Sequence, residues 1–132
     1  MVLKNRYAVK IVFENGVELR GELVKHYAPR VVEDLLYEMP FNSRAFLHNS
    51  LYVYFQAPVS TGPQNVKKYF KRKDLVFWPA ARAICIVLKD FNAKYPMCLI
   101  GEVKDDVSGL ESMKRSMTVS IQLGTEEGSP SE

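Results

Sequence analysis

The sequence predicts a mainly β fold, a closed or nearly closed barrel of about eight strands with one packed helix and a short helical turn. Three observations lead to this prediction. Apolar and polar residues alternate in many short stretches, and turn-forming residues separate these stretches at even spacing. Only one stretch has the periodicity of an amphipathic helix. No stretch resembles a βαβ unit, so a parallel sheet is not expected.

Length and composition indicate a single globular domain. The chain has 132 residues, of which 47% are hydrophobic and 25% charged, with a net charge of +3. We expect the domain to span residues 1–123, followed by a disordered acidic tail at 124–132. No apolar run is long enough for a membrane span, and the N-terminus lacks the features of a signal peptide. These features favour a cytoplasmic protein, and they predict no oligomeric state.

The first elements are a hairpin and a helix. Residues 7–14 and 17–24 alternate on either side of Asn15-Gly16, a dipeptide typical of a type I′ hairpin turn. The helix is expected over residues 30–39, where apolar side chains recur at i, i+1, i+4, i+5 and i+8. Pro29 suits the first turn of this helix, and Pro40 ends it.

The rest of the chain reads as further strands. The segment 91–96 is expected to be a turn-rich connection, and residues 105–113 a helical turn capped by Asp105 or Asp106. The expected strands lie at 43–48, 51–58, 66–72, 75–78, 83–88, 97–103 and 117–123.

The sequence offers no recognised catalytic, metal or cofactor motif. Cys85 and Cys98 lie in apolar runs, so we expect buried free thiols. His26 and His48 lack the spacing of metal ligands. No serine lies in a Gly-flanked nucleophile elbow, and no Gly-rich phosphate loop is present. We therefore assign no catalytic residue, metal ligand or cofactor.

The predicted second hairpin carries a candidate ligand-binding face. Side chains alternate along a strand, so one face of each arm gathers polar and aromatic residues. If the two faces coincide, they form a surface for a small polar ligand or an extended peptide. The alternative is an ordinary solvent-facing sheet. The residues are Arg44, Phe46 and His48 on one arm, and Tyr52, Tyr54 and Gln56 on the other.

Trp78 and Arg82 extend the candidate ligand site. Both could line the mouth of the barrel, although Trp78 could instead plug one end of the core, with Pro79 ending a strand. Arg82 stands among apolar residues, where it needs a carboxylate, an anionic ligand or a route to water.

A basic segment suggests a third possibility. The run KKYFKRK combines cations for phosphates with rings for base stacking, as single-strand nucleic-acid binders do. The alternative is that charge protects an exposed sheet edge from aggregation. Its basic residues are Lys67, Lys68, Lys71, Arg72 and Lys73.

Two stretches resemble a known family. The first is RVVEDLLYEMP, followed by a hairpin that contains Tyr54-Phe55, and the second is KDLVFWPAARAICIVL at residues 73–88. Together they resemble the cyclophilin-like family of small, mostly uncharacterised prokaryotic proteins, whose typical motifs are Trp-Gly-x-Glu-x-Tyr-Phe and Gly-Asp-x-x-Tyr-Trp-Pro. The resemblance covers residues 7 to about 123. Residues 49–52 depart from the first motif, and Lys73 replaces the glycine of the second. Asp74, Trp78 and Pro79 match the second motif, and Cys85 and Ile86 match the apolar strand containing Cys-Ile that follows it in the family.

The resemblance implies a cyclophilin-type barrel without the isomerase signature. True cyclophilins carry Phe-His-Arg-Val-Ile and Phe-Met-x-Gln-Gly-Gly, and this chain has neither. The leading hypothesis is a non-catalytic binding module for a small ligand or an extended peptide. The first alternative is a divergent peptidyl-prolyl isomerase that uses Arg44 and Gln56. The second is a nucleic-acid accessory protein that uses residues 67–73.

Overall fold

The computed structural model describes residues 5–124, and the acidic tail expected at 124–132 lies, apart from Gly124, outside the described residues. The helices are α1 (Pro29–Glu38) and three short 3-10 turns, η1 (Lys25–Tyr27), η2 (Pro79–Ala81) and η3 (Ser108–Leu110). The strands are β1 (Arg6–Phe13), β2 (Glu18–Val24), β3 (Phe41–His48), β4 (Tyr52–Gln56), β5 (Val66–Phe70), β6 (Asp74–Trp78), β7 (Ala83–Val87), β8 (Phe91–Val103) and β9 (Met117–Leu123).

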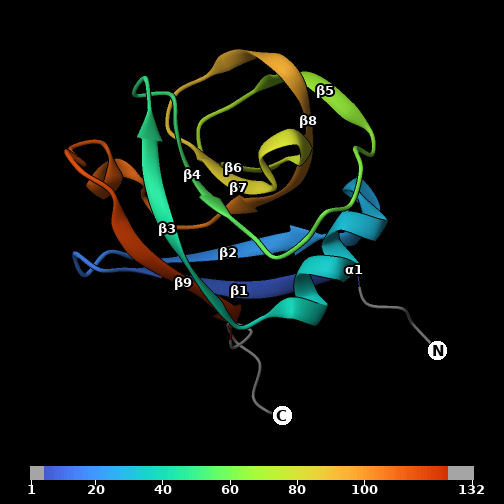
Figure 1. Cartoon of the computed structure of the whole chain (residues 1–132), viewed down its shortest axis with the longest axis horizontal. Helices are drawn as coiled ribbons and strands as arrows, with labels where there is room; N and C mark the ends of the chain where they lie inside the picture. The colour runs from blue at the N-terminus through green and yellow to red at the C-terminus, as the bar shows by residue number, and fades with distance from the viewer. Residues whose placement is uncertain (1–4, 125–132) are drawn as a thin grey trace.

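The strands form a closed antiparallel barrel. Neighbours follow the order β2-β1-β9-β3-β4-β7-β6-β8, and a pairing between β2 and β8 closes the ring (Figure 1). β5 pairs with β8 beyond the closed ring, as a ninth strand. The predicted mainly β barrel of about eight strands with one packed helix is confirmed.

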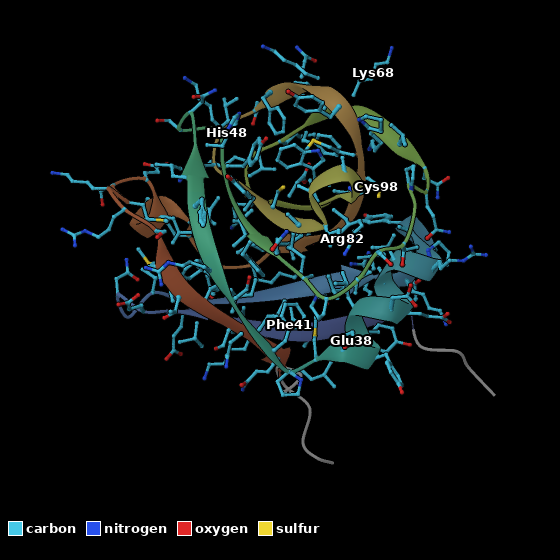
Figure 2. The ribbon with its side chains drawn as sticks, viewed as in Figure 1. Glu38, Phe41, His48, Lys68, Arg82 and Cys98 are labelled. Atoms are coloured by element: carbon cyan, nitrogen blue, oxygen red, sulfur yellow. The ribbon has the colours of Figure 1, made fainter. Side chains whose placement is uncertain are left out.

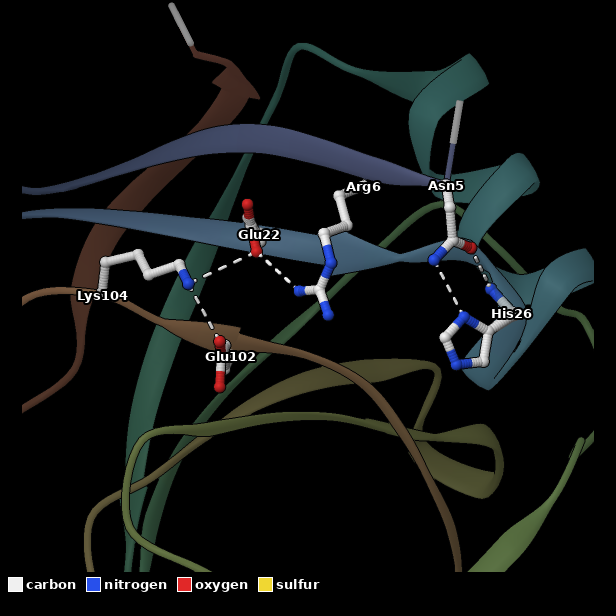
Figure 3. A network of polar contacts seen from close by, with 6 residues as sticks. All are labelled: Asn5, Arg6, Glu22, His26, Glu102 and Lys104. Carbon is white, nitrogen blue, oxygen red and sulfur yellow. Dashed lines mark hydrogen bonds and ion pairs between the residues drawn. The ribbon is translucent and has the colours of Figure 1, made fainter. Parts of the chain in front are cut away.

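Charged side chains support the closing seam. Glu22 of β2 faces Glu102 of β8, a pairing of like charges that would repel. The Nζ atom of Lys104 lies 3.4 Å from a carboxylate oxygen of Glu22 and 2.9 Å from one of Glu102. Arg6 adds a second contact to Glu22 at 2.9 Å, and Figure 3 shows these groups together. Lys104 thus bridges the two carboxylates across the seam.

Both predicted hairpins are present, but the turn of the first differs from expectation. In the first hairpin the loop comprises residues 14–16, and Gly16 has a φ of 95° whereas Asn15 does not have a positive φ. The predicted type I′ turn is therefore wrong at this position, where a three-residue loop needs only one left-handed residue. Between β3 and β4, Asn49 and Ser50 have φ values of 48° and 60°, as a type I′ turn requires.

The predicted helix is confirmed as α1, which packs against the barrel core. Val31, Val32 and Leu35 are fully buried, whereas Tyr37 is 86% exposed. The Oε1 atom of Gln64 accepts hydrogen bonds from the backbone N–H groups of the helix's first residues, at 2.7 and 3.0 Å. Within the described chain, no helix is long and apolar enough to cross a membrane.

The expected connection at residues 91–96 is wrong, because β8 is one strand of 13 residues from Phe91 to Val103. Asn92 and Pro96 are typical turn residues, which is why the sequence predicts a connection here. In the fold the first part of β8 pairs with β5 and the second part with β6, so pairing partners override local preference. A bulge in the β5–β8 register accommodates the irregular residues.

The β5–β8 ribbon packs over the outer face of β4, β7 and β6. A second apolar cluster lies between these elements, separate from the core inside the barrel. The barrel core takes alternate residues such as Phe55, Phe77 and Ile86. The buried members of the second cluster are Tyr52, Phe70, Val76, Cys85, Val87 and Met97.

The segment 105–113 contains the expected helical turn, η3. The expectation that Asp105 or Asp106 caps this turn is wrong, because Val107 is its N-cap and no side chain caps it. Asp106, one residue earlier, accepts a hydrogen bond from the backbone N–H of Ser108 at 3.2 Å. Asp105 instead accepts hydrogen bonds from Arg20, one from its backbone N–H and one from its Nη2 atom, both at 2.8 Å. The two adjacent aspartates thus have different roles.

Candidate functional site

The two predicted faces of the second hairpin coincide. In the β3–β4 register Phe46 faces Tyr54, and His48 faces Tyr52. The ring centroids of the first pair lie 5.5 Å apart, and those of the second pair are stacked at 5.0 Å. These four residues point away from the barrel core, because the alternate residues, such as Ala45 and Phe55, fill it.

Trp78 joins this face from β6. Its ring centroid lies 6.2 Å from that of Tyr52 and 5.9 Å from that of Tyr54, both in edge-to-face geometry. The expectation that Trp78 plugs the barrel core is wrong, because the residue packs against the second apolar cluster outside the barrel. Pro79 ends β6 and begins η2, as expected.

Tyr95 completes the face and was missed by the sequence reading. Its ring stacks on Trp78, with centroids 5.4 Å apart and planes inclined by 22°, and the residue is 53% exposed. Tyr95 lies in the β8 segment that local preferences assign to a connection. We define the aromatic face as the rings of Phe46, His48, Tyr52, Tyr54, Trp78 and Tyr95.

The indole N–H of Trp78 is buried and, within the described chain, has no hydrogen-bond partner. A buried donor without a partner costs about 1–3 kcal/mol, so most such groups in proteins are paired. Burial also raises the pKa of the nearby Tyr52 hydroxyl to about 12, which keeps that group neutral at ordinary pH. The face therefore consists of the buried ring of Tyr52, four half-buried rings and the exposed ring of Tyr95, with one buried donor that has no partner among the described residues.

Arg44 and Gln56 flank the aromatic face at its other end. The pairing of Ala45 with Phe55 places Arg44 and Gln56 at facing positions on β3 and β4. The Nε atom of Arg44 donates to Ser116 Oγ at 2.9 Å, and Gln56 donates to the carbonyl of Ala81 at 3.4 Å. Both side chains are exposed to solvent.

Arg82 follows η2 in the left-handed region, with a φ of 52°, and is exposed. Solvent exposure is thus the reason an arginine stands in this apolar stretch. Its carbonyl accepts a hydrogen bond from the backbone N–H of Ala57 at 2.8 Å, which ties the turn after β6 to the end of β4.

The basic segment 67–73 divides into two groups. Arg72 is held by Glu111 and by the carbonyl of Leu88, and Lys73 donates to the carbonyl of Lys104 at 3.2 Å. The other basic residues, Lys67, Lys68 and Lys71, are exposed. Arg72 and Lys73 therefore anchor the β5–β6 turn.

The free cysteines are buried, as expected. Cys85 lies in the second cluster, and the Sγ atom of Cys98 lies 3.7 Å from the carbonyl oxygen of Phe77. Burial raises the pKa of both thiols. Raised pKa values disfavour the thiolate, so neither sulfur suits nucleophilic chemistry. Among residues 5–124, no cluster of three His, Cys, Asp or Glu side chains could hold a metal ion.

Two surface cavities lie away from the aromatic face. One, of about 390 Å³, lies between α1 and the loop at residues 58–62, and includes Asp34 and Thr61, which share a hydrogen bond. The other, of about 430 Å³, lies where β1, β3 and β9 meet. Neither is lined by a residue of the aromatic face.

Comparisons with known proteins agree with this architecture. Among seven similar chains of known structure is a hypothetical protein from Archaeoglobus fulgidus, with a TM-score of 0.78 and 22% sequence identity, over 94% of this chain and 100% of that one. A search of curated proteins gives no match. The family model described as cyclophilin-like matches residues 7–122. The chain therefore belongs to the cyclophilin-like family.

Proposed function

We propose that the protein is a non-catalytic binding module that takes a small ligand or an extended peptide on the aromatic face. The β3–β4 register supports this proposal, because it brings together the two sets of side chains that the sequence could only place on separate strands. Trp78 and Tyr95 enlarge the surface from β6 and β8. Rings supply contact area at such sites, and polar groups fix the orientation of the ligand.

The unpaired indole N–H of Trp78 carries the proposal. Tyr95 covers the Trp78 ring but is itself half exposed, so its ring can be displaced at low cost in buried area. A ligand that replaces Tyr95 and presents a carbonyl would satisfy the indole donor. Such a ligand would take over the stacking contact with the Trp78 ring, and it would add a hydrogen bond to the indole N–H that the free protein lacks.

The test uses Trp78 as a reporter, because it is the only tryptophan in the chain. Titration with the peptide Ala-Ala-Pro-Ala and with a set of small aromatic carbonyl compounds should change its fluorescence in a saturable way. Tyr54→Ala should weaken that response, whereas Tyr37→Ala, on the exposed side of α1, should not. Unchanged fluorescence with every probe would count against the proposal.

A peptidyl-prolyl isomerase is the second candidate, because Arg44 and Gln56 occupy facing positions on β3 and β4. NMR exchange spectroscopy on an Ala-Pro peptide tests it, since uncatalysed exchange takes tens of seconds or longer. Acceleration that is lost in Arg44→Ala would establish the isomerase. Exchange at the uncatalysed rate, together with a Trp78 response to the peptide, would leave the non-catalytic module.

A further inference from the structure

Charge is strongly segregated along this chain. Residues 39–101 contain nine Lys or Arg and two Asp or Glu, a net charge of +7, whereas the rest of the chain carries −4. The basic part forms β3 to β7 and most of β8, which is the half of the molecule that carries the aromatic face (Figure 1). An overall charge of +3 conceals this asymmetry.

The two acidic residues of this half are already engaged. Asp74 accepts a hydrogen bond from the backbone N–H of Lys71 at 2.9 Å. Asp90 accepts one from the backbone N–H of Arg72 at 2.8 Å and one from the hydroxyl of Tyr69 at 3.0 Å. Asp74 is the first residue of β6 and Asp90 directly precedes β8, so both lie outside the rows of side chains that form the aromatic face. Asp74 keeps its negative charge beside Lys67 and Lys71, and Asp90 keeps its charge beside Lys71, so the two aspartates compensate only that part of the positive charge.

Lys68 faces the β8 segment that carries Tyr95. Lys94 directly precedes Tyr95, and its exposed side chain lies on the opposite side of β8, because the alternate residues Ala93 and Met97 pack against the second cluster. In the β5–β8 register Lys67 pairs with Met97 and Tyr69 with Asn92, so Lys68 alone faces residues 93–96. Both lysines are exposed and form no ion pair among the described residues. Figure 2 shows Lys68 projecting outward from the β5–β8 ribbon, with His48 at the end of β3.

Flat rings beside unpaired cations fit one class of partner. An acidic peptide would match the charge but not the stacked rings, and a neutral peptide would match the rings but not the charge. In a nucleic-acid duplex the faces of the bases are already stacked within the helix. A single strand offers exposed bases for the rings and regularly spaced phosphates for the lysines.

We propose that a single-stranded nucleic acid binds here, with a base stacked on the ring of Tyr95 and the neighbouring phosphates held by Lys68 and Lys94. The proposal rests on the function proposed above only in its use of the aromatic face. It names a polyanion as the ligand in place of a small molecule or an extended peptide. Distributed charge, rather than an enclosed pocket, favours a strand over a single nucleotide.

The first experiment measures binding of fluorescein-labelled decauridylate by anisotropy as salt is raised from roughly 50 mM to several times that concentration. Each phosphate contact on a single strand contributes about −0.7 to the slope of log K against log salt, so two contacts predict a slope of about −1.4 or steeper. A flat salt dependence, or no binding at the lowest salt concentration, would overturn the proposal. An unlabelled duplex of equal length should compete poorly.

Variants separate charge from stacking. The double variant Lys68→Glu with Lys94→Glu should weaken binding at least tenfold and flatten the salt slope, whereas Lys114→Glu, an exposed lysine outside residues 39–101, should change affinity less than twofold. Tyr95→Ala should weaken binding about tenfold without changing the slope. Tyr37→Ala is its matched control. Full affinity in Tyr95→Ala would overturn the assignment of base stacking.

The same samples distinguish this proposal from the function on which it rests. Each is titrated with Ala-Ala-Pro-Ala while Trp78 fluorescence is recorded. A peptide response without binding of decauridylate would overturn the nucleic-acid proposal and leave the binding module standing. The opposite result would support the nucleic acid as the ligand of this face. In that case decauridylate binds in a salt-dependent way, binding is weakened in the double lysine variant and in Tyr95→Ala, and the peptide gives no response.

Discussion

Gly101 lies so close to Glu22 that a β-carbon at Gly101 would be 1.9 Å from the carbonyl oxygen of Glu22. The two residues belong to β8 and β2, the strands whose pairing closes the barrel. No side chain fits at that distance without moving one strand away from the other. The barrel can close here only because residue 101 has no side chain. The backbone conformation of the strand does not by itself require a glycine at this position.

Gly101→Ala should lower the free energy of unfolding by about 3 kcal/mol or more, because the clash is with backbone that cannot rotate away. Urea denaturation followed by circular dichroism measures the change. Gly62→Ala is the matched control, since nothing lies within 4 Å of the place that a β-carbon would occupy there, and its effect should stay within about 0.5 kcal/mol. Equal stabilities for the two variants would contradict this account of the seam.

Local signals account for the parts of the fold that the sequence predicts. The first hairpin, α1 and the β3–β4 hairpin depend on alternation, periodicity and turn residues within about 20 positions of one another. The β2–β8 closure and the full length of β8 depend on partners far along the chain. Asn92 and Pro96 are residues that favour turns, and their place in a strand depends on the pairing of β8 with β5. A prediction from neighbouring residues alone therefore assigns them to a connection.

The candidate site was predictable to a similar degree. Alternation predicts which side chains share a face on each arm of the second hairpin. Only the β3–β4 pairing register shows that the two faces lie on the same side of the sheet. Trp78 was identified, but its position outside the core depends on the β5–β8 ribbon. Tyr95 escaped notice because its segment resembled a loop. The charge asymmetry of residues 39–101, by contrast, was visible in the sequence.

Gln64 should prove to be a stabilising cap of α1. Its Oε1 atom accepts from the N–H groups of Arg30 and Val31, which have no partner inside the helix. Gln64→Ala should cost about 0.5–2 kcal/mol of unfolding free energy, measured by urea denaturation. Gln64→Glu keeps an acceptor and adds negative charge at a helix N-terminus, so it should retain most of the stability. A loss as large as that of Gln64→Ala would refute the capping role.

Asp105 should make stability depend on pH in the acid range. Hydrogen bonds from Arg20 lower the pKa of Asp105 below its ordinary value of 3.8. The folded state therefore favours the carboxylate, and its contribution is present above about pH 4 and lost as pH falls through the lowered pKa. Because the pair is partly exposed, Asp105→Asn should cost less than about 1 kcal/mol at pH 7.

The difference in unfolding free energy between wild type and Asp105→Asn should shrink between about pH 4 and about pH 2. Glu38→Gln, an exposed carboxylate on α1, serves as the control and should show no comparable trend. A difference that stays constant over this range would mean that the carboxylate charge contributes nothing at this position.

Tyr95 should shield Trp78 from solvent. Its ring stacks on the indole at 5.4 Å, and removal of that ring opens one side of the tryptophan. Tyr95→Ala should therefore increase quenching of Trp78 fluorescence by iodide, with a loss of stability below about 1.5 kcal/mol, since aromatic pairs contribute about 0.5–1.5 kcal/mol. Because iodide is an anion, the positive charge around the face should strengthen quenching further, and neutral acrylamide separates the two effects. Tyr37→Ala should leave quenching by both agents unchanged, and the same result for Tyr95→Ala would show that Tyr95 does not cover the indole in solution.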